Sequence, residues 1–393
     1  MITKSCANRK RARLVLLSAA LAPLISLNIA HADDKIKVLY SYTDGGGAPV
    51  GFIRADGTLY GADGGGAYDS GEIFKISPDN QFSVLYAFNQ EAHEGVHPNT
   101  IPTRDGKGNL YGTTCCNLND DEGGVVYEVA PDGTYTVLHS FGQDPAGWGL
   151  SAVIYKKGNL YGVSYQGGTN GYGVIFKVTP KGDYKVLYSF DSPDLPTGAP
   201  LMDDDGNIFG TTQNGGQYGY GTIYELKPDG SKTVLHSFNP STDGAEPLPG
   251  VVRDDNGNLY GTTQGSGAGG HGTLFELAAS GTFTVLHAFV GGSGDGAQPL
   301  VDPTIIKNRN GKTELYGVTF YGGTGDVGVA YKFSALGKYK IIYNFARDNS
   351  GPALPNAPLV AGTNGKLYGA SLQGGGGTGQ GCQNGCGTIF ELH

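Results

Sequence analysis

Short apolar runs separated by Gly, Asp, Asn and Pro recur along the chain with a nearly constant period. The clearest copy is Leu259-Tyr260-Gly261-Thr262-Thr263, and successive copies lie 48 to 56 residues apart. A period of this size is typical of one supersecondary unit repeated in tandem. The seven copies begin at Leu59, Leu110, Leu160, Ile208, Leu259, Leu315 and Leu367.

Each repeat contains four apolar runs of strand length, and turn residues such as Pro228-Asp229-Gly230 separate them. This pattern predicts a four-stranded antiparallel meander. The run at 233–238 is apolar on both of its faces, with Val234, His236 and Phe238 on one and Leu235 on the other. A sheet that is packed on both sides requires a neighbour on each side, and blades arranged in a ring supply one.

The two ends of the chain indicate how the ring closes. The last repeat stops at Glu391-Leu392-His393, one strand short of a full unit, and Lys37 to Tyr42 match the missing strand. We therefore predict an all-β fold, a seven-bladed β-propeller of 28 strands. Its domain covers 33–393, and the N-terminal strand 35–43 completes the blade formed by 347–393. An open array would leave a bare sheet edge at each end.

Residues 1–32 have the pattern of a secretory signal peptide. The basic run Arg9-Lys10-Arg11 precedes apolar residues 14–29, and Ala30-His31-Ala32 provides a small-x-small cleavage site. We expect an exported protein, periplasmic or extracellular. No second long apolar segment follows, so no membrane span is expected.

The charge and composition of the chain limit the classes of binding partner that we expect. After residue 32 the chain carries 22 basic and 36 acidic side chains, a net charge of −14. Nucleic acids and anionic membranes require a positive surface, so neither is an expected partner. The 68 glycines and 24 tyrosines agree with short strands joined by tight turns. We expect a monomer.

Four cysteines follow the signal segment: Cys115, Cys116, Cys382 and Cys386. An even number in an exported chain favours disulfides. A bridge between Cys382 and Cys386 would staple one loop, whereas a bridge between the adjacent Cys115 and Cys116 would be strained. The sequence leaves all three connectivities open. A zinc site is the rival interpretation, but no histidine accompanies either pair.

The repeat resembles the GloVer tandem-repeat family of exported bacterial proteins, whose members carry different surface anchors. The segments that carry the resemblance are Gly257 to Thr263, Gly221 to Leu226, Pro228-Asp229-Gly230 and Thr233 to Phe238. The resemblance covers essentially the whole chain after the signal segment. It implies export, and it implies no reaction and no catalytic residues. The chain ends at His393 directly after a strand, so we expect no anchoring tail.

Three features that suggest chemistry have simpler explanations. Asp203 to Asn207 resemble a calcium loop, but they lead straight into a strand, so we interpret them as a hairpin turn. His139, His236 and His287 share one slot that holds Tyr in other repeats, which indicates packing rather than a metal site. The glycine-rich loops lack the helix that a phosphate loop opens. We predict no catalytic residue, no metal and no cofactor.

One feature favours binding. The diglycine loops between the second and third strands should share a rim with the connections between blades, and aromatic residues there would stack on sugar rings or grip a peptide. We therefore predict a non-enzymatic binding module for an extracellular glycan or protein. The alternative is an extracellular lyase or hydrolase in the channel mouth, with acidic residues or histidines near Asp302 within hydrogen-bonding reach of one another. The candidate ligand-binding residues are Tyr68, Trp148, Tyr172, Tyr218, Tyr220, His271 and Tyr321.

Overall fold

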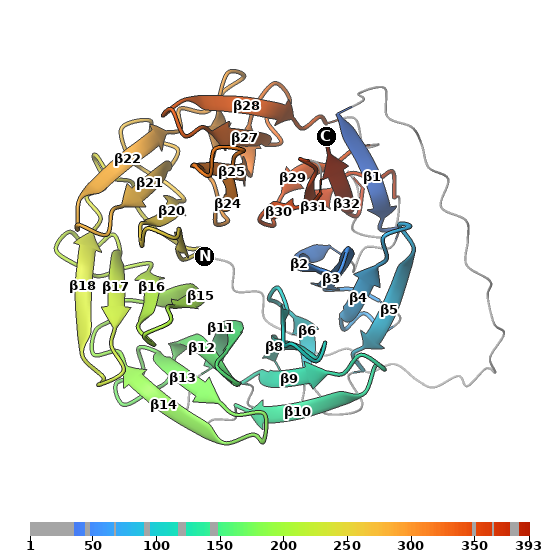
Figure 1. Cartoon of the computed structure of the whole chain (residues 1–393), viewed down its shortest axis with the longest axis vertical. Coiled ribbons are helices and arrows are strands. Elements are labelled where there is room, and N and C mark those ends of the chain that lie inside the picture. Colours follow the sequence, from blue (N-terminus) through green and yellow to red (C-terminus); the bar gives the residue numbers. More distant parts are fainter. Residues whose placement is uncertain are drawn as a thin grey trace, which may run out of the picture.

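Seven small antiparallel sheets are arranged in a ring around a central channel (Figure 1). This computed structural model describes residues 35–43, 48–66, 68–89, 95–116, 123–141, 148–347, 351–363, 365–377 and 385–393. No helix occurs among these residues. The predicted seven-bladed β-propeller is confirmed.

The strands of each blade follow one another outward from the channel. Blade 1 comprises β2 (Pro49–Ala55), β3 (Thr58–Asp63), β4 (Glu72–Ile76) and β5 (Phe82–Ala87). Blade 2 comprises β6 (Val96–Pro98), β7 (Thr103–Arg104), β8 (Leu110–Cys116), β9 (Val125–Val129) and β10 (Tyr135–Ser140). Blade 3 comprises β11 (Trp148–Lys156), β12 (Asn159–Gln166), β13 (Val174–Val178) and β14 (Tyr184–Ser189). Blades 4 and 5 comprise β15 (Pro196–Met202), β16 (Ile208–Thr212), β17 (Thr222–Leu226) and β18 (Lys232–Ser237); and β19 (Val252–Arg253), β20 (Leu259–Thr263), β21 (Thr273–Leu277) and β22 (Phe283–Ala288). Blades 6 and 7 comprise β24 (Thr304–Lys307), β25 (Thr313–Thr319), β27 (Val329–Phe333) and β28 (Tyr339–Asn344); and β29 (Ala353–Pro355), β30 (Val360–Ala361), β31 (Leu367–Gln373), β32 (Thr388–Leu392) and β1 (Ile36–Ser41).

The structure has more strand segments than the 28 expected, for two reasons. The innermost strand is interrupted in blade 2, between β6 and β7, and in blade 7, between β29 and β30. Each gap contains a proline, Pro102 or Pro358, which has no N–H to donate to the ladder. In addition, β23 (Gly296–Ala297) and β26 (Tyr321–Gly322) form a short extra pair beside blade 6.

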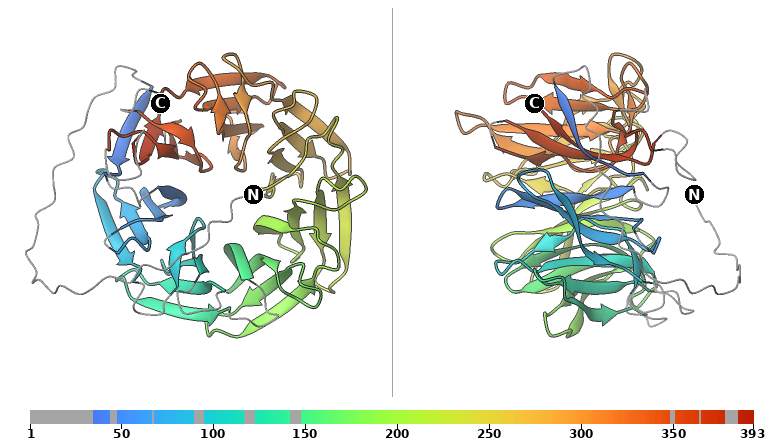
Figure 2. Two further views of the ribbon diagram at one scale, coloured as in Figure 1. Left: turned by 180° about the vertical axis from the view of Figure 1, so that it is seen from behind. Right: turned by 90° about the vertical axis from the view of Figure 1, so that its right-hand side faces the viewer.

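The N-terminal strand closes the ring, as predicted. β1 pairs antiparallel with β32, and Ile36 lies opposite Leu392. Figure 2 shows β1 lying along the last blade. The bulge that interrupts the outermost strand pair of the other blades recurs here between Val38 and Tyr40. The seam therefore has the same local geometry as an ordinary blade and leaves no unpaired edge on β32.

The glycine of each Leu-Tyr-Gly segment has a packing reason. Gly210 of β16 lies directly opposite Tyr224 of β17, and a Cβ at Gly210 would stand 2.4 Å from the Tyr224 hydroxyl oxygen. The aromatic ring thus covers the glycine, and no side chain fits between them. The seven glycine–aromatic pairs are Gly61–Phe74, Gly112–Tyr127, Gly162–Phe176, Gly210–Tyr224, Gly261–Phe275, Gly317–Tyr331 and Gly369–Phe390.

The hydrophobic core lies between neighbouring blades. Phe209, Ile223 and Phe238 of blade 4 pack against Leu259 and Phe275 of blade 5 in one cluster, and similar clusters join other adjacent blades. Each blade therefore packs against a neighbour on both sides. The outermost run 233–238 is only partly covered, since Phe238 is fully buried but Val234 is 47% exposed. Contacts of this kind hold the ring rigid and leave the loops to vary.

Candidate functional site

One face of the ring carries the loops between the second and third strands together with the connections between blades. We call this face the loop rim. The two kinds of loop are bonded to each other: Glu246 N donates to Tyr220 O (3.2 Å), and Gln298 N donates to His271 O (2.9 Å). The opposite face carries the other hairpin turns, and we call it the turn face. The predicted sharing of one rim is therefore observed.

The loop rim exposes most of the predicted aromatic residues. Tyr321 packs edge-on against Phe320, whereas no ring contact of the other four rim tyrosines is found within the described residues. The side chain of His271 is also exposed. The relative exposures are 55% for Tyr68, 37% for Tyr172, 45% for Tyr218, 46% for Tyr220 and 38% for Tyr321.

Two of the predicted residues lie in strands rather than loops. Trp148 is the first residue of β11, where it pairs with Gln166, and its side chain is not among those described. Tyr321 begins the short strand β26. The sequence placed both in loops because neither segment alternates strongly enough to indicate a strand.

A hollow of about 500 Å³ lies beside Tyr218 on blade 4. It is formed where the diglycine loop meets the outermost strand β18 and the connection to blade 5. All of its lining residues except Val234 and Leu235 carry a polar side-chain atom. The lining comprises Gln217, Tyr218, Val234, Leu235, His236, Ser237, Asn239, Thr242 and Asp243.

Hydrogen bonds fix the polar wall of this hollow. The Asp243 carboxylate accepts from His236 Nε2 (3.1 Å), from Asn239 N (3.1 Å) and from Thr242 Oγ1 (2.7 Å). Burial lowers the pKa of His236, against the opposing effect of Asp243. The imidazole is therefore held neutral near pH 7, and Nε2–H donates to the carboxylate. The wall is preorganised and presents hydrogen-bonding groups rather than a net positive charge.

The shared histidine slot joins neighbouring blades by stacking. The His236 ring lies 3.7 Å from the Phe283 ring of blade 5, with the two planes 2° apart. His287 stacks on Tyr339 at 3.7 Å in the same way. Tyr fills the slot in the other repeats, and where the next blade also offers a ring the two stack, as Tyr86 does on Tyr135. The packing interpretation accounts for all three histidines, since His139 stacks on Tyr184.

The central channel is a second cavity, of about 550 Å³, and segments from all seven blades line it. Its walls are mostly apolar, with Ile53, Ile101, Ile154 and Leu300 among them. The lining residues are Val50, Ile53, Asn99 to Thr103, Leu150 to Ile154, Gly198, Ala199, Pro249, Leu300 to Asp302, Asn356 and Pro358.

Asp302 lines the channel, as the sequence suggested, but it has no partner for acid–base work among the described residues of the lining. The channel lining contains no second acid and no histidine. Burial raises the pKa of Asp302 to about 7. The pair of close carboxylates or histidines that the enzyme alternative requires is thus not found in the channel lining.

Three other features of the sequence are the acidic segment at Asp203, the possible metal ligands and the cysteines. The Asp203 carboxylate accepts from Gly206 N and Asn207 N, both at 2.9 Å, so this segment is a hairpin turn, as expected. The described residues contain no group of three or more His, Cys, Asp or Glu side chains able to hold a metal. Neither predicted cysteine pair has both side chains described, because Cys382 lies outside the described residues and the Cys116 side chain is not described. Cys115 and Cys386 are each disulfide-bonded, and the pairing of the four cysteines remains a prediction.

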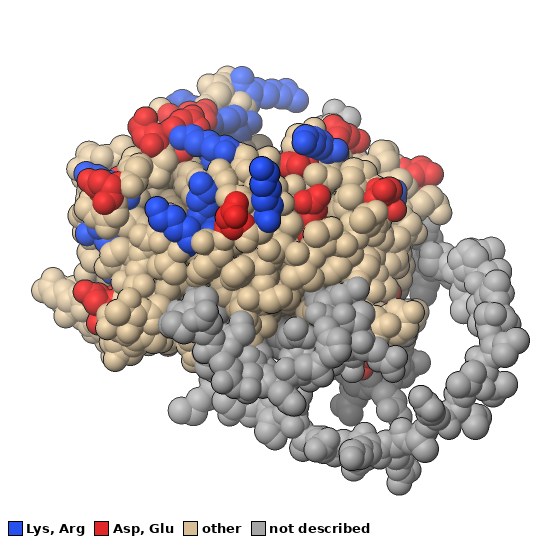
Figure 3. Space-filling view, turned by 90° about the horizontal axis from the view of Figure 1, so that it is seen from below, with Lys and Arg blue, Asp and Glu red and all other residues tan. Residues whose placement is uncertain are grey.

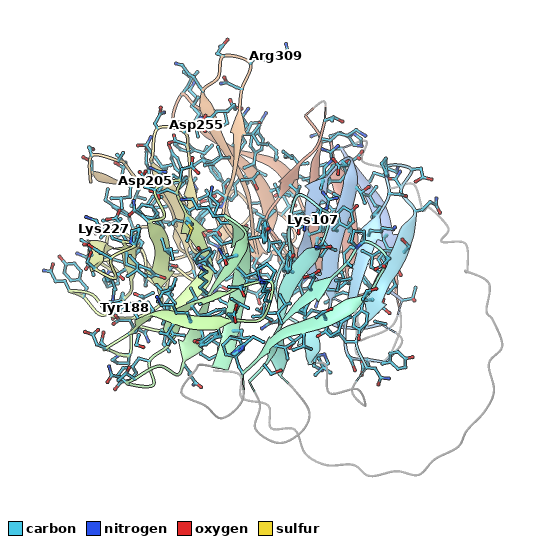
Figure 4. All side chains as sticks on the ribbon, turned by 60° about the horizontal axis from the view of Figure 1, so that its bottom comes forward. Lys107, Tyr188, Asp205, Lys227, Asp255 and Arg309 are labelled. Carbon is cyan, nitrogen blue, oxygen red and sulfur yellow. The ribbon has the colours of Figure 1, made fainter. Side chains whose placement is uncertain are left out.

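Charged side chains concentrate on the turn face. Figure 3 shows Lys, Arg, Asp and Glu gathered on one side of the ring, and Figure 4 places Lys107, Asp205, Asp255 and Arg309 on turns of that side. Several pair across neighbouring blades, including Lys156 with Asp204 at 3.0 Å. Exposed pairs of this kind contribute little stability. The turn face is therefore polar and solvated, whereas the exposed tyrosines belong to the loop rim.

The family follows from the repeat itself. A family model described as the Gloeobacter/Verrucomicrobia repeat matches residues 24–197 and 196–393. The chain belongs to the Gloeobacter/Verrucomicrobia repeat family. The two matches together span all seven blades of this Gloeobacter/Verrucomicrobia repeat protein and confirm the resemblance of its segments. No curated protein matches the chain.

Solved structures share the fold of this repeat protein. One is the extracellular domain of a protein described as a one-component system of B. thetaiotaomicron, with 11% identity and a TM-score of 0.54 over 91% of this chain and 40% of that one. Another is a puromycin hydrolase, with 14% identity and a TM-score of 0.50 over 86% of this chain and 53% of that one. The chain spans about half or less of the length of these proteins. At such identities the likeness shows the propeller fold alone.

Among the described residues no helix is long and apolar enough to cross a membrane.

The sequence indicated the rim tyrosines and Asp302 but not the hollow beside Tyr218. Asn239, Thr242 and Asp243 come from the connection after β18, more than 20 residues beyond Tyr218. The apolar pattern does not show that these two segments meet, although the connection carries a recurring segment, Asp243 to Pro247 and Asp295 to Pro299.

Proposed function

We propose that this protein is an exported, non-enzymatic binding module that holds an extracellular glycan at its loop rim. The observation that carries the proposal is the hollow beside Tyr218, where an exposed aromatic ring faces a fixed polar wall. Sugars present an apolar face of C–H groups and a periphery of hydroxyls. A site for them therefore combines an aromatic platform with several hydrogen-bonding side chains.

The residues of the hollow suit this chemistry. Tyr218 provides the platform, and Val234 and Leu235 form an apolar patch next to it. Gln217 is tied down because its backbone N–H donates to Ser237 Oγ at 3.3 Å. Gln217 and Asn239 both line the hollow with amide side chains, and Asn239 Oδ1 accepts from Ser241 N at 3.0 Å. Groups held in place before binding lose little conformational entropy when the ligand arrives.

Other rim tyrosines extend the surface. Tyr172 on blade 3 and Tyr220 on blade 4 are both exposed on the loop rim, so a polymer of several sugar units would cross more than one blade. The signal segment and net charge of −14 support an exported monomer, periplasmic or extracellular, that avoids nucleic acid. No catalytic residue is assigned.

Retention of the purified protein on arrays of bacterial and plant glycans tests the proposal. We expect retention of at least one glycan, lost in Tyr172→Ala with Tyr220→Ala and preserved in Leu336→Ala. Leu336 is an exposed apolar residue in a turn-face hairpin, which makes it a matched control. Retention on a cell-wall protein fraction but on no glycan would assign the rim to a protein partner and contradict the proposal.

A further inference from the structure

The central channel contains buried oxygen atoms whose hydrogen-bonding capacity is unused. Asp302 Oδ1 and Asn356 Oδ1 are both shielded from solvent, and neither has a hydrogen-bond partner among the described residues. Both residues line the channel of about 550 Å³. Buried polar atoms are rarely left unpaired, since each costs free energy. Both oxygens are free to accept hydrogen bonds from molecules in the channel, either water or a ligand that carries donors.

Asp302 takes no part in the amide links that join neighbouring blades elsewhere in the ring, because the position equivalent to Asn99 and Asn356 in blade 6 is Leu300, two residues before it. Asn99 Nδ2 donates to Leu150 O (3.4 Å), and Asn356 Nδ2 donates to Pro49 O (2.8 Å). Each of these amides thereby links its blade to the next. An ionised carboxylate has no proton to donate, so Asp302 cannot make such a link. Its presence in the segment that enters β24 is not explained by holding the ring together.

The surroundings of Asp302 exclude several ligand classes. None of the described residues that line the channel is Lys, Arg or His, so an anion would meet a carboxylate and no counter-charge. A divalent cation would find a single carboxylate, fewer charged ligands than such ions require. A purely apolar molecule would leave both oxygens unpaired. A compact cation with its own donors and a hydrocarbon part would satisfy the carboxylate, the unpaired oxygens and the apolar walls together.

We propose that the channel binds a small primary ammonium ion with an aliphatic body. The ammonium group donates to Asp302 Oδ1, and the unpaired Oδ1 of Asn356 on the adjoining blade is a second acceptor in the same channel. The hydrocarbon body packs against Ile101, Ile154 and Leu300. An ammonium has three donors and fits a site of several acceptors better than a guanidinium, which needs a planar fork.

The acid–base behaviour of Asp302 agrees with this site. Burial raises its pKa to about 7, because no positive group in the lining compensates the charge. A bound ammonium would supply that charge and hold the carboxylate ionised. Among the described residues, Asp302 is the only titratable one in the lining. Its charge helps to raise the pKa of Tyr331, a buried residue of β27. This site is independent of the loop rim.

Calorimetric titration of the purified protein at pH 8 with n-hexylamine hydrochloride, hexan-1-ol and sodium hexanoate tests the proposal. We expect hexylammonium to bind at least about ten-fold more tightly than hexanol, since charged hydrogen bonds exceed neutral ones by that factor, and hexanoate not to bind. Asp302→Asn should abolish the preference for the amine. Asp205→Asn, which alters an exposed carboxylate on the turn face, should retain it.

Equal affinity of the wild type for the amine and the alcohol, or no amine binding at millimolar concentration, would overturn the proposal without any variant. Retention of the preference in a folded Asp302→Asn protein would overturn it as well. Circular dichroism and a thermal melt establish that the variant is folded. Tyr218→Ala should leave amine binding unchanged, so failure of the rim proposal and failure of this one are distinguishable.

Discussion

The backbone N–H of Tyr42 donates to the carbonyl of Gly387 across 3.1 Å, and this bond joins the first described strand to the last blade. The same bond in blade 4 runs from Phe238 to Gly221 at 3.0 Å, and in blade 5 from Phe289 to Gly272 at 3.0 Å. The seam therefore repeats the construction of an intact blade. Because the N-terminal strand is the outermost strand of the last blade, hydrogen bonds close the ring and no covalent link is needed.

Removal of residues 35–43 should weaken the protein and make it associate. The deletion strips the ladder partner from β32 and uncovers Ile389 and Phe390, which are fully buried. We expect a fall in the melting temperature of several degrees and dimers or larger species in light scattering, because a bare strand edge recruits another chain. A truncated protein that stays monomeric with an unchanged melting temperature would contradict the closure.

Gly210→Ala should destabilise the fold strongly for a one-carbon change. Its new Cβ would stand 2.4 Å from the hydroxyl oxygen and 2.6 Å from Cζ of the buried Tyr224. Overpacking of this kind costs about 1–3 kcal/mol, measurable by urea unfolding. Gly106→Ala is the control, since nothing lies within 4 Å of its Cβ position. Tyr224→Leu combined with Gly210→Ala should recover part of the loss; no recovery would argue against the ring as the cause.

Tyr224→Phe should leave stability unchanged or raise it by about 1 kcal/mol. The Tyr224 hydroxyl is buried and has no partner among the described residues, and Phe occupies the same position in blades 1, 3, 5 and 7. Tyr111→Phe is the contrast, because the Tyr111 hydroxyl donates to Asp105 Oδ2 at 3.1 Å. That variant should lose about 1 kcal/mol. Equal losses in both variants by urea unfolding would show that the Tyr224 hydroxyl has a partner.

Asp302→Asn should stabilise the protein at high pH and not at low pH. The pKa of Asp302 is raised to about 7 in the folded state and is near 3.9 in an unfolded chain, so ionisation opposes folding. This destabilisation of the folded state is absent below about pH 4, grows between pH 4 and 7 and reaches its full value above pH 7. At pH 8 the variant should gain up to about 4 kcal/mol.

Urea unfolding of the wild type and of Asp302→Asn at pH 4, 6 and 8 measures this difference, with Asp205→Asn as the control. Comparing the variants at each pH cancels the contribution of every other carboxylate. A gain that does not vary with pH would mean that Asp302 titrates normally.

The architecture was predictable because the repeat encodes it redundantly. Gly210 and its counterparts must lack a side chain, Phe238 and its counterparts must be buried, and these demands recur at fixed intervals that the sequence displays directly. The split inner strands were not predictable, since they depend on where Pro102 and Pro358 interrupt a ladder. The hollow beside Tyr218 depends on two loops meeting in space, and loop conformation is not encoded in an apolar pattern.

The affinity of the rim for its glycan tests the central functional claim most directly. Calorimetric titration with the glycan best retained on the array compares the wild type with Tyr218→Ala and Leu336→Ala. We predict that Tyr218→Ala weakens binding by about ten-fold or more through loss of the aromatic platform, whereas Leu336→Ala binds like the wild type. Equal affinities of the two variants would contradict the claim.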